Sequence, residues 1–545
     1  MADKEFNLLD EKWIRVIDDK CGITEVSLKE VFRSAHLYKD LCGELPTQDF
    51  AMLRLLLAVL HTVFSRYDSD GNESPLEEPD DALDRWKELW DNKKFPEKPI
   101  IDYLESYRES FYLFHPERPF YQVEKAKIGT EYKNTAKLNG CLSESNNKVR
   151  LFQNISGQTK KAMKYSEAAR WLIYVNSFDD VSSKQPAESK KVNGKLPALS
   201  VGWLGQLGLI CNTGNNLFET LMLNFLLLNR NDELYDREIP IWERETIPDN
   251  ERSKIVVPNN LSQLYTLQSR RLFLKKADKK VTGYYLLGGD FFDKENAFIE
   301  PMTVWRQAQD KSKEKYIPKE HNHSRQFWRD FPLYTMSGKF EPGVIIWEKA
   351  LVDRMIIKDS FLTFKIASVI YDKSQAASLP VLNVYSDSFM LHSSLISKMD
   401  LEWQTMIQNS IEFCENISKK VWTLAKDVNI ASGGDFIPKE DKCSAKVAAN
   451  KAVSDFYARI DVPFRKWLCS LDPTVDIASD RQTEWRKKCV DIAKKLGEDI
   501  IGSVPSSAIF GKLKNGESDK PETVSAAEAH KWFIIGINKV KKDRG

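Results

Sequence analysis

The sequence lacks the features that mark the common classes of enzyme and metal protein. Its eight cysteines form no CxxC pair and follow no short regular spacing. This argues against a zinc site and a disulfide framework, and favours reduced thiols in a cytoplasm. No GxxxxGK[ST] loop is present, and the glycines at 202, 205, 208 and 214 do not fit GxGxxG with a downstream acid. Nucleotide-dependent chemistry therefore has no support, and we expect no cofactor.

An excess of one charge and a long apolar run are also missing. The 80 Lys and Arg residues almost cancel the 79 Asp and Glu residues, so no overall field points to a nucleic acid or a membrane. Such an affinity must come from local patches. No run of about 18 apolar residues occurs, and the opening MADKEFNLLDEKW lacks the apolar core of a signal peptide. We therefore expect a cytosolic protein.

A chain of 545 residues has room for several domains. Residues 1–385 mix the patterns of strands and helices. In this region Phe6–Val16 predicts a turn that leads into a strand, with Trp13 and Ile14 as core anchors. The apolar spacing of Leu45–Ser65 predicts a buried helix, and the acidic stretch Asp68–Asp84 predicts a solvated loop.

The remaining region, residues 386–545, has the pattern of a helical bundle. Apolar residues recur at helical spacing in four segments that polar connections separate. The segments are residues 388–428, 442–471, 478–501 and 524–541. Ser525 and Glu528 have capping-box spacing at the start of the last one. We therefore predict an α+β fold, with a large mixed α/β N-terminal domain followed by an antiparallel four-helix bundle in which nothing looks catalytic.

A stretch late in the first region predicts a β-hairpin. Apolar and β-branched residues crowd Phe361–Tyr371 and Leu379–Tyr385, and short polar residues separate them at Asp372–Ser378. The tip offers Lys373, Ser374, Gln375 and two alanines, a set small enough to enter a narrow groove and polar enough to hydrogen-bond there. The alternative is a solvent-exposed loop without function.

Two further stretches combine amides with cations. Asn146–Gln153 lies in a Ser/Asn-rich region surrounded by lysines, and Lys184–Lys195 is a second basic stretch. Amides, cations and one aromatic residue are what phosphate binding and base stacking require. A polar loop without a ligand is the alternative.

Charge clusters and histidines are weaker signals. Arg270–Lys280 holds six basic residues and Lys311–Lys319 holds more, but charge runs are usually solvated faces. Glu320–His323 raises the question of a metal site or an HNH-like nuclease, yet no further ligands follow at matching spacing. His115, beside a proline in an aromatic cluster, is more often structural than catalytic.

Five features occur in the same order as in one known family. They are FNLLDEKWIRV at Phe6–Val16, HPERPFYQ at His115–Gln122, the Asn-rich loop at Asn146, the hairpin tip at Tyr371–Leu379 and the terminal bundle. Together they resemble the large subunit, CasA, of the type I-E CRISPR surveillance complex, Cascade. The resemblance covers essentially the whole chain, and its first two motifs are the most specific.

The resemblance implies a non-catalytic DNA-recognition subunit. In such proteins the N-terminal domain reads the protospacer-adjacent motif (PAM) in double-stranded DNA, and the bundle contacts the small subunits and the DNA path. The complex opens the duplex next to the PAM, lets the guide RNA pair and recruits a separate helicase-nuclease. The implied partners are thus target DNA, the crRNA-containing Cascade with its backbone and small subunits, and that helicase-nuclease, with no membrane.

The resemblance also assigns residues. Gln375 matches the glutamine that wedges under the PAM and displaces the first target base pair. Ala376 matches the hairpin residue that lies against the PAM, with Lys373 and Ser374 beside them. The DNA-contacting loop of the family matches Asn147, Lys148, Arg150 and Phe152.

Two elements depart from the family pattern. The minor-groove lysine of the family falls near Gly289, so Lys294 or one of the lysines at 275, 276, 279 and 280 is the candidate. The glycine loop falls near Asn193–Pro197, where Gly194 is the only glycine. These departures leave the PAM preference open.

Two other classes of function remain as alternatives. A scaffold or RNA-binding subunit without PAM reading would use the bundle and the basic patches as contact surfaces. A metal-dependent nuclease would rest on His115, His321 and His323.

Overall fold

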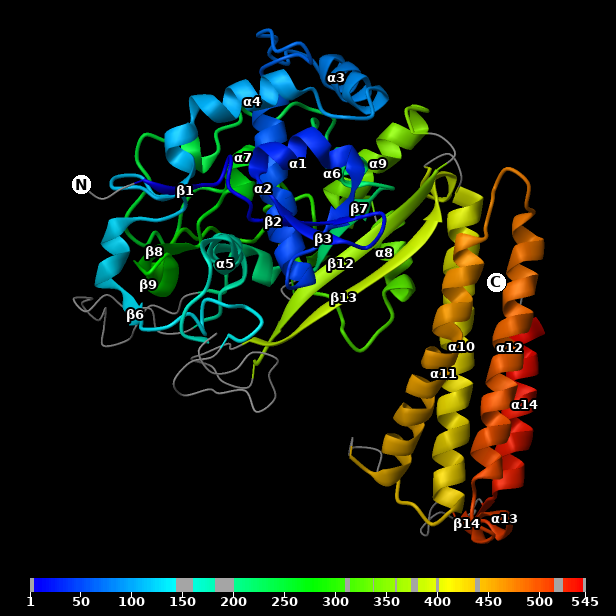
Figure 1. The fold of residues 1–545 in the computed structure, drawn as a ribbon. Helices are drawn as coiled ribbons and strands as arrows, with labels where there is room; N and C mark the ends of the chain where they lie inside the picture. Colours follow the sequence, from blue (N-terminus) through cyan, green and yellow to red (C-terminus); the bar gives the residue numbers. More distant parts are fainter. Residues whose placement is uncertain are drawn as a thin grey trace. The chain divides into compact units, whose positions relative to one another are not determined.

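The structure is a computed structural model. It describes residues 4–143, 160–181, 200–308, 314–336, 338–357, 360–373, 381–397, 401–436, 442–513 and 523–542. The chain divides into two compact units, whose elements Figure 1 shows. The α/β unit comprises Met1–His323, Ser337–Leu351 and Leu362–Ser388, and the helical unit comprises Ser324–Met336, Val352–Phe361 and Phe389–Gly545. Both units are discontinuous in sequence, and the domain boundary after residue 385 stays a prediction.

Small antiparallel sheets begin the α/β unit. β2 (Ile14–Asp18) pairs with β3 (Ile23–Val26) and β4 (Tyr38–Leu41), and β1 (Glu5–Asn7) pairs with β5 (Tyr112–Phe114). Trp13 and Ile14 are fully buried, and the indole N–H of Trp13 donates to the carbonyl of Leu8 at 2.9 Å. The predicted turn into a strand, with these two residues as anchors, is confirmed.

The central helix of the α/β unit is α2 (Pro46–Phe64), which lies where apolar spacing predicted it. It packs against α5 (Tyr165–Phe178) and α7 (Leu261–Tyr265). Among the helices of the described residues, only α2 is long and apolar enough to span a membrane. Because nearly all of its side chains are buried in the unit, it has the surroundings of a core helix in a globular protein.

The predicted acidic loop is partly wrong. It ends inside α3 (Pro79–Asp91), which begins where a loop was expected to continue. Pro79 occupies the first turn, and Glu78 and Asp81 form a capping box in which the Asp81 carboxylate accepts from the Glu78 N–H at 2.9 Å. The carboxylates counted as signs of a loop therefore include the cap of a helix.

Further short elements complete this unit. The helices are α1 (Leu28–Ser34), α4 (Glu97–Ser106), α6 (Leu217–Leu223) and α9 (Gly343–Asp353), and β10 (Trp305–Gln307) pairs with β11 (Tyr316–Pro318). Arg54 of α2 forms a fully buried ion pair with Glu300, with two N–O distances of 2.7 and 2.9 Å. This pair joins the central helix to a segment 246 residues later.

A three-stranded sheet carries a lysine-rich turn. β8 (Arg270–Ala277) and β9 (Lys280–Gly288) form a hairpin, and β6 (Thr130–Tyr132) pairs with the other edge of β9. The connecting residues Asp278 and Lys279 have φ angles of +50° and +55°, as a two-residue type I′ turn requires. The chain thus reverses within two residues and presents lysines at the tip.

The predicted hairpin lies in a second three-stranded sheet. β12 (Phe361–Tyr371) lies between β7 (Leu209–Thr213) and β13 (Val381–His392). The bounds of β12 match the prediction. β13 overlaps the second predicted strand but continues beyond Tyr385 to His392. Two paired strands are therefore confirmed, with the second longer than expected.

The helical unit is the predicted four-helix bundle. Its helices are α10 (Leu401–Ala431), α11 (Ser444–Cys469), α12 (Ala478–Gly502) and α14 (Ala526–Lys542), and α10 packs against the other three. The short elements α8 (Phe331–Thr335), α13 (Ser507–Phe510), β14 (Lys512–Leu513) and β15 (Thr523–Val524) accompany them. The predicted cap of α14 is present, since Ser525 accepts from the Glu528 N–H at 3.2 Å.

The bundle starts later than predicted. The helical reading from Ser388 is wrong, because β13 extends to His392 and α10 begins at Leu401. Phe389 and Leu391 are buried whereas Met390 is 41% exposed. This alternation has the period of a strand, and the apolar residues around it also fit a helical spacing.

Candidate nucleic-acid interface

A buried tyrosine anchors the hairpin at the end of its first strand, where the chain enters the tip. Tyr371, the last residue of β12, donates its hydroxyl proton to the carbonyl of Phe178 at 2.7 Å. Burial, with Tyr174 and Asp179 nearby, raises the pKa of Tyr371 well above its usual value, so the phenol stays protonated and donates. Gly205 makes room for it, because a Cβ there would lie 2.3 Å from the tyrosine oxygen.

Lys373 is the one residue of the predicted hairpin site that the structure describes. Its ammonium pairs with Glu320 at 2.6 Å, and both side chains are more than half exposed. The other hairpin residues assigned by the resemblance, Ser374, Gln375 and Ala376, lie outside the described residues. So do Asn147, Lys148, Arg150, Phe152 and Gly194. Their roles stay predictions.

Exposed lysines gather along one side of the β6–β9–β8 sheet, and we call this group the basic edge. Met163 forms a β-bridge with Val281, and the end of β6 pairs with Tyr284. Backbone pairing therefore places residues from three segments beside one another. The basic edge consists of Lys133, Lys161, Lys164, Lys279 and Lys280, all exposed.

The solvated face expected for Arg270–Lys280 is wrong at its start. Arg270 and Arg271 are buried, and their guanidinium groups pair with Asp179 and Asp290, each at 2.6 Å. The remaining lysines lie nearer the tip, and Lys275 and Lys276 pair with Glu131 and Glu5 at 2.5 and 2.6 Å. The charge run enters the core because its first two cations meet carboxylates that sequence spacing does not reveal.

The two sets of candidates for a minor-groove lysine follow opposite ends of β9. Lys279 and Lys280 stand at the tip, while Lys294 is exposed in the segment that leaves the strand after Gly288. At about 3.3 Å per residue, the nine residues of β9 separate these ends by roughly 26 Å. A substitution in one set therefore leaves the other set in place.

Two of the three histidines named as catalytic candidates, His115 and His321, have structural partners. His115 accepts through Nδ1 from the backbone N–H groups of Glu117 and Arg118 at 3.1 and 2.9 Å. His321 hydrogen-bonds through Nε2 with the carbonyl of Leu209 at 2.8 Å. Across the described ranges, no group of three or more His, Cys, Asp or Glu side chains is arranged to hold a metal ion.

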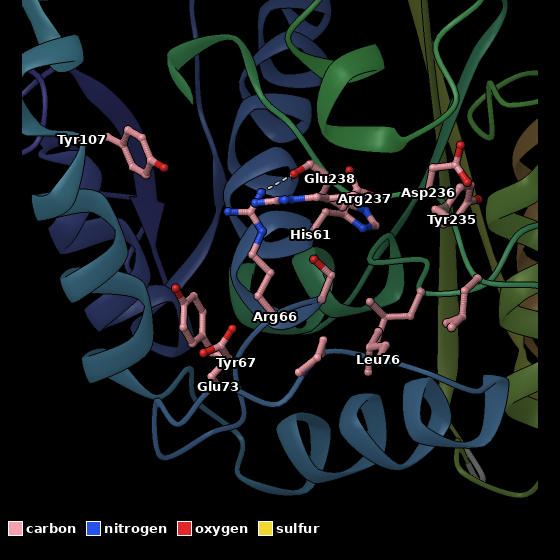
Figure 2. A pocket seen from close by; sticks show the side chains of 14 residues that line it. His61, Arg66, Tyr67, Glu73, Leu76, Tyr107, Tyr235, Asp236, Arg237 and Glu238 are labelled. Atoms are coloured by element: carbon pink, nitrogen blue, oxygen red, sulfur yellow. Dashed lines mark hydrogen bonds between the residues drawn. The ribbon is translucent and has the colours of Figure 1, made fainter. Parts of the chain in front are cut away.

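A separate cavity of about 600 Å³ lies at the C-terminal end of α2 (Figure 2). Its walls come from the last turn of that helix, the residues that follow it, Tyr107 and the segment Leu227–Glu238. The volume falls within the range of small-molecule sites, which is roughly 300 to 1,000 Å³. The cavity is therefore a second candidate site.

Two charged groups of this cavity, Arg66 and Glu238, bond other groups of the protein. Arg66 forms two bonds to Glu243, at 2.8 and 2.9 Å, and donates to the backbone carbonyl of Glu238. The Glu238 carboxyl accepts from the backbone N–H groups of Leu261 and Ser262 at 3.3 and 2.5 Å. Burial raises the pKa of Glu238 to about 7.

His61 also lines the cavity, and burial lowers its pKa to about 3. Its neutral ring packs against Phe225 and Tyr265, with centroid separations of 4.8 and 5.7 Å. No sequence motif predicts this cavity, because the burial that shifts the pKa values of Glu238 and His61 arises only when the chain folds. The bonds of Arg66 and Glu238 hold the wall together, the Nε2 of His61 is buried without a hydrogen-bond partner, and these groups identify no reaction.

Comparisons with known proteins agree with the motifs. The family model for CRISPR-associated protein Cse1 matches residues 7–496. The CRISPR-associated protein CasA/Cse1 of Thermus thermophilus is 28% identical over 450 residues, which are 79% of each chain. The crystal structure of Thermobifida fusca Cse1 is 26% identical, with a TM-score of 0.80 over 98% of each chain.

A more distant structure shares the fold. A chain in a solved CRISPR RNA-guided surveillance complex has 14% identity and a TM-score of 0.67, covering 98% of this chain and 100% of that one. The family match spans most of the sequence, including the motifs at both ends of the α/β unit. The chain therefore belongs to the CRISPR-associated Cse1 (CasA) family, the large subunits of type I-E Cascade.

Proposed function

We propose that this chain is the subunit of an RNA-guided CRISPR surveillance complex that recognises the PAM in double-stranded DNA through the minor groove. It then wedges open the adjacent duplex to start R-loop formation. Membership in the Cse1 family supports the assembly, as does the fold shared with a chain of a surveillance complex. The observation that carries the DNA-reading role is the hairpin, whose first strand ends on the anchored Tyr371 just before the tip.

In this proposal the strands hold position and the tip acts. Gln375 is the wedge and Ala376 lies against the PAM, with Ser374 and Lys373 beside them. The ion pair of Lys373 with Glu320 is exposed on both sides, and such a pair contributes at most about 1 kcal/mol. Lys373 can therefore exchange this carboxylate for a DNA phosphate at little cost.

The lysines outside the hairpin supply a salt-dependent hold on DNA. The basic edge offers exposed ammonium groups, and Asn147, Lys148, Arg150 and Phe152 are proposed as the neighbouring DNA-contacting loop. Gly194 and Lys294 are proposed as the glycine-loop and minor-groove contacts. With the net charge of the chain near zero, local cations give weak contacts that permit scanning.

The energetics of this role need no nucleotide hydrolysis. The minor groove mainly distinguishes A·T from G·C pairs, so a reader with few small groups tolerates several PAM sequences. Opening one base-pair step loses about 1.4 kcal/mol of stacking, which a wedge in the vacated space and guide pairing can offset. The proposed partners are target DNA, the crRNA-containing complex and a helicase-nuclease, in the cytoplasm, and the subunit itself is non-catalytic.

The assignment of Gln375 is tested by duplex opening in the assembled complex. We expect Gln375→Ala to leave assembly intact and to slow opening next to a PAM, measured with a fluorescent base analogue in the first target pair. Ser386→Ala, at an exposed position of β13, is the control and should open DNA at the parental rate. Parental kinetics in the Gln375 variant would rule out the wedge.

The alternative of a scaffold or RNA-binding subunit predicts a different result. In that case the assembled complex would bind PAM-bearing and PAM-less duplexes equally, whichever tip residue is changed. A gel shift with both duplexes and charge reversal at Lys148 and Arg150 separates the two readings. PAM reading requires a preference for the first duplex, and the loop assignment requires a flatter salt slope in the charge-reversed variant.

A further inference from the structure

Described residues near the ends of three predicted DNA-contacting segments are connected through buried side chains to one short stretch of chain. Residues 144–159, 182–199 and 374–380 contain the proposed contacts, and the described residues on their borders include Ser143, Lys160, Ser200 and Lys373. Three buried side chains connect these borders to the stretch Phe178–Asp180. Phe178 is the last residue of α5, and Asp179 and Asp180 follow the helix. We call this stretch and its three partners, Lys137, Arg270 and Tyr371, the stem cluster.

Arg270 holds the two ends of the segment 182–199. Its Nε donates to the Asp179 carboxylate at 2.6 Å. Its Nη2 donates to the carbonyls of Asp179, Asp180 and Ser200, at 3.2, 3.0 and 3.0 Å. The side chain is fully buried, so these bonds form where water does not compete.

Lys137 connects that stretch with the segment 144–159. Its ammonium pairs with the Asp180 carboxylate and donates to the Ser143 hydroxyl at 3.3 Å. The side chains of the ion pair are only 7% and 6% exposed. Two residues earlier, the Thr135 hydroxyl donates to the carbonyl of Lys160 at 3.2 Å. Thr135 and Lys137 therefore contact the described residues on both sides of the segment 144–159.

Tyr371 brings in the hairpin through its bond to the Phe178 carbonyl. Phe178, Asp179 and Asp180 thus accept from Tyr371, Arg270 and Lys137. Arg270 and Lys137 also bond the border residues Ser200 and Ser143, and Tyr371 precedes the border residue Lys373 by two positions. Removing one partner of a buried ion pair leaves an uncompensated charge at a high cost in free energy, so these pairs favour the arrangement in which both partners meet. All three side chains of the stem cluster therefore bind the same stretch, Phe178–Asp180.

We propose that Lys137 is a positioning residue for PAM recognition, which holds Ser143, the described residue before the segment 144–159, to Asp180. The inference rests on the proposed function. Lys137 touches no DNA in this role. It acts by fixing where that segment starts.

The chain offers a matched control. Lys349 pairs with Glu341 at 2.8 Å, with side chains 4% and 6% exposed, so its burial resembles that of the Lys137–Asp180 pair. Both residues lie in the α/β unit, and neither borders one of the three segments. Lys349→Met and Lys137→Met therefore remove equivalent ammonium groups, but only the second loosens the stem cluster.

The experiment measures PAM discrimination by the assembled complex. The probe is a duplex pool randomised at the positions next to a guide-matched sequence, and the readout is the enrichment of bound over unbound duplexes. We expect Lys137→Met to lower the enrichment about tenfold, a change of about 1.4 kcal/mol, with non-specific binding unchanged. Lys137→Arg, which keeps the positive charge, should recover most of it, and Lys349→Met should keep the parental value.

A second readout does not depend on DNA. Hydrogen exchange in the peptides that contain Ser143 and Asp180 should rise in Lys137→Met and stay parental in Lys349→Met. Equal losses of enrichment in both variants, or parental enrichment in Lys137→Met, would overturn the positioning role. A parental complex without any PAM enrichment would instead contradict the proposed function and remove the basis of this role.

Discussion

Both units bury aromatic side chains, but the α/β unit also buries ion pairs. In the α/β unit, buried charges join segments far apart in sequence, as in Arg54–Glu300 and Arg270–Asp179. In the helical unit, Trp328 stacks on Phe464 at 3.9 Å, and Trp485 packs edge-on against the same ring at 4.9 Å. Ion pairs of the bundle such as Arg459–Asp499 are partly exposed.

The difference separates two ways of specifying a structure. An apolar helix face needs only correct spacing and volume, so many side chains satisfy it. A buried charge needs one partner at one place, because its desolvation is offset only by that partner. The α/β unit uses both ways, with an apolar core around α2 and buried ion pairs, and the contacts named for the bundle are of the first kind.

The substitution with the largest expected loss of stability removes a buried charge. Arg270→Met leaves the Asp179 carboxylate buried without its cation, which should destabilise the α/β unit by about 3–5 kcal/mol. The measurement is urea unfolding followed by hydrogen exchange in the peptides of α5 and β8. A loss below about 1 kcal/mol would mean that Asp179 finds another partner and that the comparison overstates the role of Arg270.

A smaller change in stability is expected from the titration of Glu238, a buried carboxyl that accepts from backbone N–H groups. The pKa of Glu238 is about 7 in the folded protein, against an ordinary value of 4.5, so the folded state holds this proton more tightly. Stability should therefore fall as the pH rises from about 4.5 to about 7 and then level off. The expected loss is roughly 3 kcal/mol, at 1.36 kcal/mol per pKa unit.

Glu238→Gln removes this pH dependence and retains an oxygen for the N–H group of Ser262. We expect the variant to match the parent near pH 4.5 and to exceed its stability at pH 8, in urea titrations at both pH values. An unchanged pH profile in the variant would place the titration on another group.

The smallest expected effect tests the bundle surface. Arg459 and Asp499 form an ion pair at 2.7 Å, but the side chains are 38% and 52% exposed. Arg459→Ala should therefore change the unfolding free energy by less than about 0.5 kcal/mol, measured by thermal unfolding of the bundle helices. A loss comparable to that of Arg270→Met would erase the contrast between the units.

Much of the architecture was predictable from local pattern. Trp13, Ile14, α2 and the bounds of β12 follow from apolar spacing, because a period of two or 3.6 residues suits one element and one buried face. The errors have local causes too. The carboxylates of Glu78 and Asp81 cap a helix but have the sequence pattern of a charged loop, and the end of β13 fits both periods.

The candidate site also has features that local sequence predicts and features that distant residues decide. The hairpin and its tip were visible as a pattern and a resemblance, and Lys373 lies where the strand bounds predict. The burial of Arg270 and Arg271 was not visible, because their partners Asp179 and Asp290 stand 91 and 19 residues away. A charge run looks the same in sequence whether it meets water or a carboxylate.

The sequence by itself determined most of the elements, the class of fold and the family, since each depends on periodicity and motifs within short windows. Only the tertiary structure decided that Lys137, Arg270 and Tyr371 converge on Phe178–Asp180, and that Glu238 holds its proton near neutral pH. The physical reason is desolvation. The free energy of a buried polar group depends on the few groups around it, and long-range packing alone brings those groups together.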